Sequence, residues 1–259
     1  MKYELYEVGG HVRDGLLGLP SKDIDYTVVI ENDGGVVCEY GPGTVNGCWP
    51  IEVYEYPLNA FEDFVDEIKS QGYEVFLETP DCLTVRAKRP DSKEVADFVI
   101  ARKETYTPES RTPTVTLGSL EDDILRRDFT VNCIARDKDG NIIDLVGGVK
   151  DLRQGILRTP IDTSLSFNDD PLRILRAIRF NIIKDFDFSD AVMSALINYP
   201  LDRLKLVSEE RIREELYKCF SHDSQMTLRK LINLEHDGCF LLSWILSNTS
   251  IWFNPTLKK

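Results

Sequence analysis

Two segments, GGHVRD at residues 9–14 and DIDYTVV at residues 23–29, carry the pattern that decides the fold. The second segment leads into an apolar, β-branched run, which predicts a strand over residues 24–30. Residues i and i+2 of a strand point to the same face, so Asp23 and Asp25 would lie about 7 Å apart where it begins. Such like charges repel unless a cation lies between them, and Mg²⁺ takes one or two carboxylates together with phosphate oxygens.

The first segment has the features of an anion site. Gly9 and Gly10 allow the backbone to approach a ligand closely. A helix predicted over residues 12–17 would direct its N-terminal amides at an anion, and Arg13 supplies a guanidinium fork that matches phosphate. Each motif alone is common in turns and strand edges, but the two in this order indicate a site for a metal-bound triphosphate.

A third carboxylate interrupts another apolar run, the strand predicted over residues 94–101. An unpaired carboxylate is costly to bury, so Asp97 faces either solvent or a metal ion. A carboxylate from a neighbouring strand, added to Asp23 and Asp25, would complete the ligands of a two-metal site.

The composition limits the choice of protein class. A chain of 259 residues, 42% of them hydrophobic, suits two compact units or one domain with a helical extension. It has no long apolar run, no signal peptide is recognised, and its six cysteines are scattered. We therefore expect reduced thiols and a cytoplasmic location. The net charge of −13 argues against a uniformly basic nucleic-acid-binding surface, although clustered arginines could still form a local positive cleft.

Periodicity predicts the remaining elements. Strands are expected over 3–8, 73–77, 83–87 and 141–145, and helices over 59–71, 120–127, 148–157, 189–198, 208–220, 225–235 and 239–246. Residues 31–58, rich in glycine and aromatic residues, read as an irregular or hairpin insertion, and residues 103–118 as a polar, proline-containing loop.

Two sets of polar residues are not needed for packing and are therefore candidates for binding a ligand. Residues 126–134 contribute Arg127, Asp128 and Asn132, because their apolar neighbours supply the packing. A helix opens at Pro171 with Asp170 as its predicted N-cap, and Arg173, Arg176 and Arg179 follow at intervals of three. These arginines fan over roughly 120° of the helix, either as a solvated face or as an anion site.

The motifs, in this order and spacing, resemble the tRNA nucleotidyltransferase (CCA-adding) and bacterial poly(A) polymerase family of the polymerase-β superfamily. The resemblance implies an α+β fold. A nucleotidyltransferase head, with a mixed or antiparallel sheet and flanking helices, would occupy residues 1–157 and include the insertion at 31–58. An all-α neck that recognises the nucleotide would occupy residues 158–259.

The resemblance also implies residue roles. Asp23, Asp25 and Asp97 would be the catalytic carboxylates and the ligands of Mg²⁺. The nucleotide would be bound by Gly9, Gly10, Arg13, Arg127, Asp128, Asn132, Asp170, Arg173, Arg176 and Arg179. Within this set, Asp170 and Arg173 would read the edge of the incoming base.

The implied activity is Mg²⁺-dependent addition or repair of the CCA end of tRNA with CTP and ATP. Oligo(A) addition is an alternative, and so is a nucleotide-binding module or a protein-modifying nucleotidyltransferase without RNA recognition. The acidic charge favours the last alternative, whereas the base-reading pair and the arginine stripe oppose it. The family's body and tail domains are not found in this sequence, so a partner chain or an oligomer is expected to replace them.

Overall fold

The computed structural model describes residues 2–21, 23–31, 56–92, 94–107 and 110–251. The chain divides into two compact units: the first comprises residues 1–103, 115–123 and 135–143, and the second comprises 104–114, 124–134 and 144–259. This division differs from a single boundary after residue 157, because the chain passes between the units several times. Most of the predicted insertion at 31–58 lies outside the described residues.

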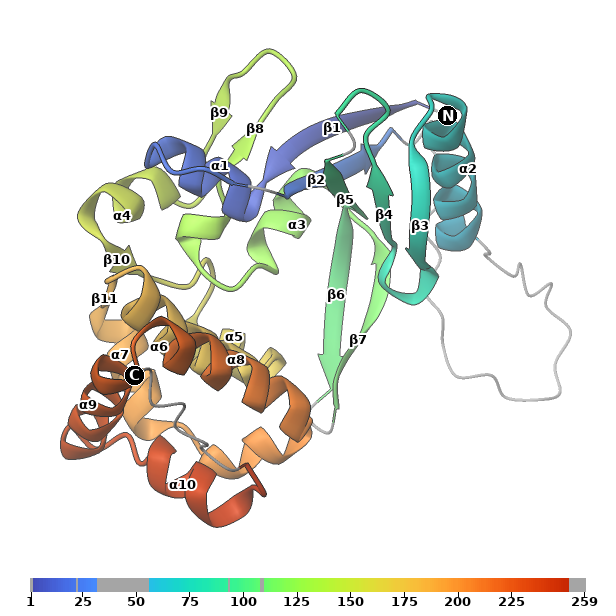
Figure 1. Cartoon of the computed structure of the whole chain (residues 1–259). Coiled ribbons are helices and arrows are strands. Elements are labelled where there is room, and N and C mark those ends of the chain that lie inside the picture. The colour runs from blue at the N-terminus through green and yellow to red at the C-terminus, as the bar shows by residue number, and fades with distance from the viewer. Residues whose placement is uncertain (1, 22, 32–55, 93, 108–109, 252–259) are drawn as a thin grey trace, which may run out of the picture. The chain divides into compact units, whose positions relative to one another are not determined.

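The first unit is built on a seven-stranded sheet in the order β3-β4-β5-β2-β1-β8-β9 (Figure 1). Its strands are β1 (Tyr3–Val8), β2 (Ile24–Ile30), β3 (Glu74–Thr79), β4 (Thr84–Lys88), β5 (Val95–Ile100), β8 (Ala135–Arg136) and β9 (Ile142–Ile143). The β2–β5 pair is parallel and the other pairs are antiparallel, so the predicted mixed sheet is confirmed. The short 3₁₀ turn η1 (Pro80–Cys82) joins β3 to β4.

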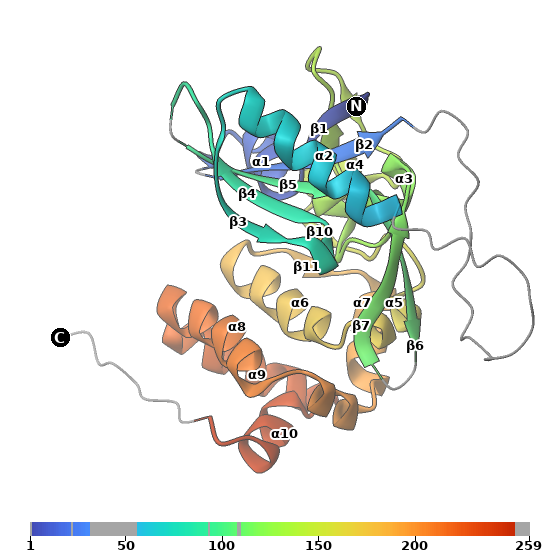
Figure 2. The same ribbon diagram turned by 90° about the vertical axis from the view of Figure 1, so that its right-hand side faces the viewer.

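Helix α2 (Tyr56–Ser70) lies across one face of this sheet, over β3, β4 and β5 (Figure 2). Phe61, Phe64 and Ile68 of the helix pack against Val85 and Phe98 from the strands, all almost fully buried. Burying each such side chain contributes about 1.5–3 kcal/mol. The helix begins earlier than the predicted Asn59, since a proline at position 57 is compatible with a first helical turn. The opposite sheet face is therefore the one left to carry polar groups.

The prediction of a loop over residues 103–118 is wrong. Strands β6 (Arg102–Thr107) and β7 (Ser110–Leu117) form a two-stranded sheet of their own. The prolines and polar residues of this segment are typical of a loop, and backbone hydrogen bonds stabilise a hairpin regardless of side-chain polarity. Residues 114–117 nevertheless alternate between polar and apolar, and Val115 and Leu117 pack against the core.

The remaining helices, turns and short strands complete the described part of the chain. They are α1 (Gly9–Leu16), α3 (Leu120–Leu125), η2 (Thr130–Asn132), α4 (Gly148–Gln154), α5 (Thr163–Asp169), α6 (Leu172–Ile183), α7 (Asp190–Asn198), η3 (Leu201–Leu206), α8 (Glu209–His222), α9 (Ser224–His236) and α10 (Leu241–Asn248), with strands β10 (Ile156–Leu157) and β11 (Asp187–Phe188). The predicted helix over 148–157 ends early because Gly155 adopts a left-handed conformation (φ 66°). None of the described helices has the length and apolar character needed to cross a membrane.

Helix α4 approaches η2 so closely that it requires glycine at position 148. A Cβ atom added to Gly148 would lie 2.1 Å from the backbone oxygen of Thr130. We expect Gly148→Ala to lower the free energy of unfolding by about 1–3 kcal/mol or more, because backbone must move to relieve the overlap. Urea denaturation measures this change. Gly15→Ala, where Cβ would meet only the mobile end of Arg136, is the control and should be close to neutral.

The described cysteines are free thiols: Cys82 is exposed, whereas Cys133, Cys219 and Cys239 are buried. Burial raises the pKa of Cys219 to about 12, which leaves very little of the reactive thiolate at mildly alkaline pH. We expect iodoacetamide to alkylate Cys82 in the native protein and to modify Cys219 only after denaturation. Peptide mapping by mass spectrometry distinguishes the two, and rapid native labelling of Cys219 would contradict its burial.

Candidate active site

The predicted catalytic carboxylates lie at one end of the parallel β2–β5 pair. Asp25 is the direct partner of Asp97 in the register of these strands. Paired residues on neighbouring strands point to the same face and lie about 4.8 Å apart. Asp23 immediately precedes β2 and is exposed, and Asp25 and Asp97 are half-buried. The strand register therefore brings Asp25 and Asp97 together, although they are far apart in the sequence.

Arg86, which was not among the predicted site residues, also reaches this position. Its Nε donates to Oδ1 of Asp97 at 2.6 Å, and Arg86 is the direct partner of Asp97 in the antiparallel β4–β5 register. The described residues contain no group of three or more acidic, histidine or cysteine side chains arranged around a common metal position. Mg²⁺ nevertheless prefers oxygen ligands such as carboxylates. The side chains of Asp23, Asp25 and Asp97 therefore have the right chemistry to bind this ion.

Helix α1 begins directly after β1, earlier than predicted. Gly9 is its first residue and has a positive φ of 68°, a conformation that glycine adopts at little cost. The guanidinium of Arg13 lies over Gly10: a Cβ at that glycine would be 3.6 Å from Nη2. Arg13 is buried and donates to Asp14 at 2.9 and 3.0 Å. The helix start and the arginine thus form one compact group, in which the Asp14 carboxylate offsets the charge of Arg13.

A buried hydrogen bond between Thr27 and Asp123 holds β2 in place next to the carboxylates. Thr27, two residues after Asp25, donates through Oγ1 to Oδ2 of Asp123 at 2.7 Å, and both side chains are fully buried. Buried polar groups of this kind are costly unless paired, so the bond constrains the position of the strand.

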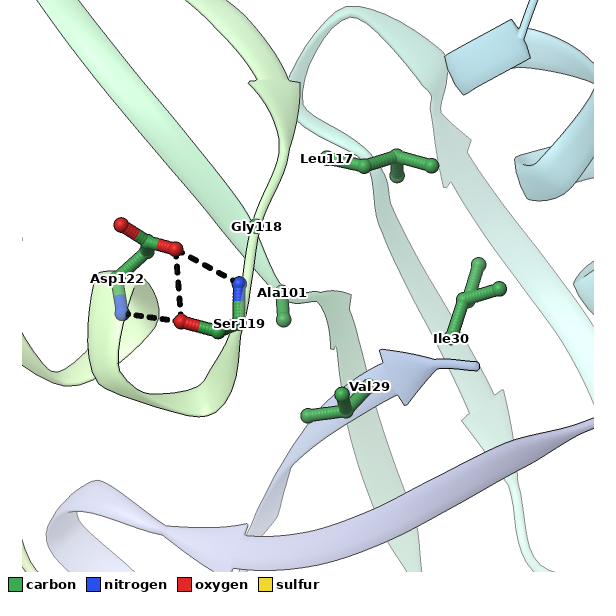
Figure 3. Close-up of a pocket in the computed structure, with 7 residues that line it drawn as sticks. All are labelled: Val29, Ile30, Ala101, Leu117, Gly118, Ser119 and Asp122. Carbon is green, nitrogen blue, oxygen red and sulfur yellow. Dashed lines mark hydrogen bonds between the residues drawn. The ribbon is translucent and has the colours of Figure 1, made fainter. Parts of the chain in front are cut away.

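A pocket of about 340 Å³ in the first unit is a poor candidate for the site (Figure 3). It is lined by Val29, Ile30, Ala101, Leu117, Gly118, Ser119 and Asp122. Its polar side chains are already bonded to each other, since the backbone N and Oγ of Ser119 donate to Asp122 at 2.8 and 2.7 Å. These bonds cap the start of α3.

In the second unit, Asp128 is bonded to two other predicted nucleotide-binding residues, Arg176 and Asn132. Nε and Nη2 of Arg176 donate to its Oδ2 at 2.8 and 2.5 Å, and Nδ2 of Asn132 donates to its Oδ1 at 2.9 Å. Burial acts to raise the pKa of Asp128, but the Arg176 guanidinium and the bond from Asn132 outweigh it and hold the pKa well below its usual value. The carboxylate is therefore ionised and held in place.

The start of α6 differs in detail from the prediction. Pro171, not Asp170, is the N-cap residue, yet Oδ1 of Asp170 still accepts the backbone N–H of Leu172 at 3.1 Å. Arg173 is buried; its Nη1 donates to Oγ of Ser166 at 2.7 Å and its Nη2 to the backbone oxygen of Arg126 at 2.5 Å. These bonds fix the guanidinium of Arg173 relative to α5.

Two of the three arginines of the stripe, Arg176 and Arg179, pair with carboxylates of the chain. Arg179 pairs with Glu215 of α8 just as Arg176 pairs with Asp128. Burial acts to raise the pKa of Glu215, and the Arg179 guanidinium overrides it and lowers the pKa. Arg127 is half-buried in the turn before η2. The stripe is thus neither a purely solvated face nor, in this structure, a set of exposed cations.

Sequence reasoning missed two residues that position others. Asp151 of α4 is buried and accepts from Thr130 Oγ1 at 2.7 Å and from Arg158 Nε at 3.1 Å, which anchors η2. Arg86 binds Asp97, as described above. One sequence signal could have found Arg86. Val85 and Ala87 on either side of it face the core, so alternation along the strand places Arg86 on the opposite face.

A mixed sheet with carboxylates opposed on β2 and β5, and a glycine-initiated helix carrying an arginine, defines a protein of the nucleotidyltransferase class. The profile of the poly A polymerase head domain matches residues 59–158. The tRNA nucleotidyltransferase cca2 of Schizosaccharomyces pombe is 36% identical over 228 residues, which cover 83% of this chain and 43% of that protein. The chain belongs to the tRNA nucleotidyltransferase (CCA-adding) and poly(A) polymerase family.

Solved structures agree with this assignment. The CCA-adding enzyme of Bacillus stearothermophilus, crystallised with CTP, superposes with a TM-score of 0.67 at 27% identity and covers 92% of this chain and 49% of its own. A tRNA nucleotidyltransferase in complex with a primer tRNA and an ATP analogue has a TM-score of 0.63 at 26% identity, covering 97% of this chain and 61% of its own. The chain thus spans about half the length of the curated relative above. Members of the family generally need a divalent metal ion.

Proposed function

We propose that this protein is a Mg²⁺-dependent nucleotidyltransferase that adds or repairs the CCA end of tRNA, using CTP and ATP. The observation that carries the proposal is the register of β2 and β5, which pairs Asp25 with Asp97. This pairing occurs in a chain whose relatives include enzymes crystallised with CTP, and with a primer tRNA and an ATP analogue.

In this proposal the first unit binds the metal ions and the triphosphate. Asp23, Asp25 and Asp97 are the metal ligands. The N-terminal amides of α1 at Gly9 and Gly10, together with Arg13, bind phosphate oxygens, since a helix start and a guanidinium both favour anions. When bound, Mg²⁺ supplies Lewis acidity that activates the RNA 3′-hydroxyl and stabilises the leaving pyrophosphate.

The second unit selects the base and binds the sugar and phosphates. Asp170 offers an acceptor and Arg173 a donor fork, which together match the edge of C or A. The bonds of Arg173 to Ser166 and Arg126 support this role, because they restrict the guanidinium before substrate arrives. Arg127, Asp128 and Asn132 line the nucleotide pocket, and Arg176 and Arg179 contact ribose and phosphate.

The reaction forms one bond and breaks one. The RNA 3′-oxygen loses its proton to solvent and bonds to the α-phosphorus of the nucleotide, while the bond from that phosphorus to the bridging oxygen of the pyrophosphate breaks. Arg13 and the α1 amides offset the charge that develops on the phosphate oxygens.

The direct test incubates the purified chain with a tRNA transcript that ends before CCA, MgCl₂ and each labelled triphosphate, followed by sequencing of the products. We expect C, C and A to be added in order. Tracts of A alone would indicate oligo(A) addition, and absence of any incorporation would contradict the proposal.

We further propose a cytoplasmic location, because the described cysteines are free thiols, as is usual in a reducing compartment.

A further inference from the structure

The strand pair β3–β4 has an exposed, partly aromatic surface that the proposed site does not account for. Phe76 and Leu77 of β3 are 50% and 49% exposed. They lie on a strand at the edge of the seven-stranded sheet, where exposed large apolar residues invite unwanted pairing. Such a surface in a monomer usually marks a binding site.

This surface is on the sheet face opposite α2. Val85 and Ala87 of β4 pack into the core under the helix, so Arg86 and Lys88, which alternate with them, point the other way. Leu77 is the direct partner of Arg86 in the β3–β4 register. A β-bulge between Val75 and Leu77 adds Phe76 to the strand there.

Cations and the aromatic ring are interleaved on this surface. Lys88 Nζ lies 6.0 Å from the centre of the Phe76 ring. Lys88 also pairs with Glu74 at 3.0 Å, and both side chains are well exposed. Exposed pairs of this kind contribute little, so a phosphate group can displace the carboxylate at low cost.

The same surface leads to the candidate catalytic residues. Leu77, Arg86, Asp97 and Asp25 are successive partners across β3, β4, β5 and β2. A polymer bound along β3 and β4 would therefore end within a few strand spacings, of about 4.8 Å each, of the carboxylates.

We propose that this β3–β4 surface, made of Phe76, Leu77, Arg86 and Lys88, binds the single-stranded 3′ end of the RNA substrate. Bases stack on Phe76 and Lys88 contacts a phosphate, as is usual where aromatic and basic side chains alternate. Arg86 remains bonded to Asp97 and joins this surface to the carboxylates. The inference rests on the proposed function and adds to it the path of the RNA. An acidic protein surface would fit the cations but leave the ring without a partner.

The test measures binding of a fluorescently labelled tRNA transcript ending before CCA, by anisotropy, in Phe76→Leu, Phe76→Tyr and Lys88→Gln. We expect Phe76→Leu to raise the Kd for RNA about fivefold to hundredfold, the effect of ~1–3 kcal/mol per stacked base. Phe76→Tyr keeps the ring and should bind like the parent. Lys88→Gln should reduce the slope of log K against log salt concentration by about 0.7, the value for one single-strand phosphate contact.

Two matched controls use other parts of the same unit. Ile142→Ala removes an exposed apolar side chain from the opposite edge strand, β9. Lys69→Gln breaks the Lys69–Glu78 pair, which joins β3 to α2 and has exposure similar to the Lys88–Glu74 pair. Neither should change the Kd for RNA. Steady-state kinetics should show a higher KM for RNA in Phe76→Leu, with the KM for CTP and kcat unchanged.

Three results would overturn the inference: an unchanged Kd in Phe76→Leu, an equal loss in Ile142→Ala, or a change confined to the oligomeric state measured by light scattering. The last would assign β3 to pairing with a second copy of the chain. Because the Kd is measured without catalysis, its outcome is separate from the incorporation assay. A protein that incorporates CTP while Phe76→Leu binds RNA normally would disprove the β3–β4 surface alone.

Discussion

Asp25→Ala is expected to reduce incorporation of labelled CTP into tRNA by more than about a hundredfold. Loss of a residue that only supports a metal ligand costs 10–100-fold, and loss of a ligand itself should cost more. The side chain is half-buried at the start of β2 and belongs to no hydrophobic core, so the fold should persist.

Single-turnover kinetics with saturating nucleotide isolates the chemical step of this variant. The control is Asp63→Asn, which alters an exposed carboxylate on α2, on the other face of the sheet. Thermal unfolding checks that the fold is intact, and a Mg²⁺ titration of the unfolding midpoint reports metal binding independently of activity. An Asp25→Ala protein that retains parental incorporation would refute the assignment of the site.

Arg176→Ala is expected to lower the free energy of unfolding by about 3–5 kcal/mol, because it leaves the carboxylate of Asp128 buried without its cation. The Asp128 side chain is only 8% exposed, and Arg176 contributes two of its hydrogen bonds. Urea denaturation at neutral pH measures the loss. Arg211→Ala, at an exposed position on α8, should change the free energy of unfolding by no more than about 0.5 kcal/mol.

Asp128→Asn in the Arg176→Ala background should recover part of the loss, since an amide costs less to bury than a charge.

The Asp128–Arg176 pair also predicts a pH dependence of stability. The folded-state pKa of Asp128 is below its unfolded value of about 3.9, so the unfolded chain binds more protons between the two. The stabilisation is thus complete above about pH 5 and is lost as the pH falls through the folded pKa. Equal acid sensitivity in parent and Arg176→Ala would contradict this attribution.

Local patterns in the sequence were sufficient for the elements that carry the site. Alternation at β1 and apolar runs at β2 and β5 predicted these strands, and β4 was also predicted, all to within about two residues. The placement of Asp23 and Asp25 on one strand face stays a prediction, because Asp23 lies at a bend just before β2. The hairpin β6–β7 was missed because its prolines and polar residues are typical of a loop, although Val115 and Leu117 alternate with threonines and pack against the core.

The sequence by itself determined which residue types are available: three carboxylates, a glycine pair ahead of a predicted helix, and three arginines at intervals of three in α6. The tertiary structure alone decided their partners. Asp97 faces Asp25 and Arg86 because of strand register, and Arg176 and Arg179 bind carboxylates 48 and 36 positions away in the chain. Pairing across such separations depends on how strands and helices pack in three dimensions, and a one-dimensional pattern does not encode it.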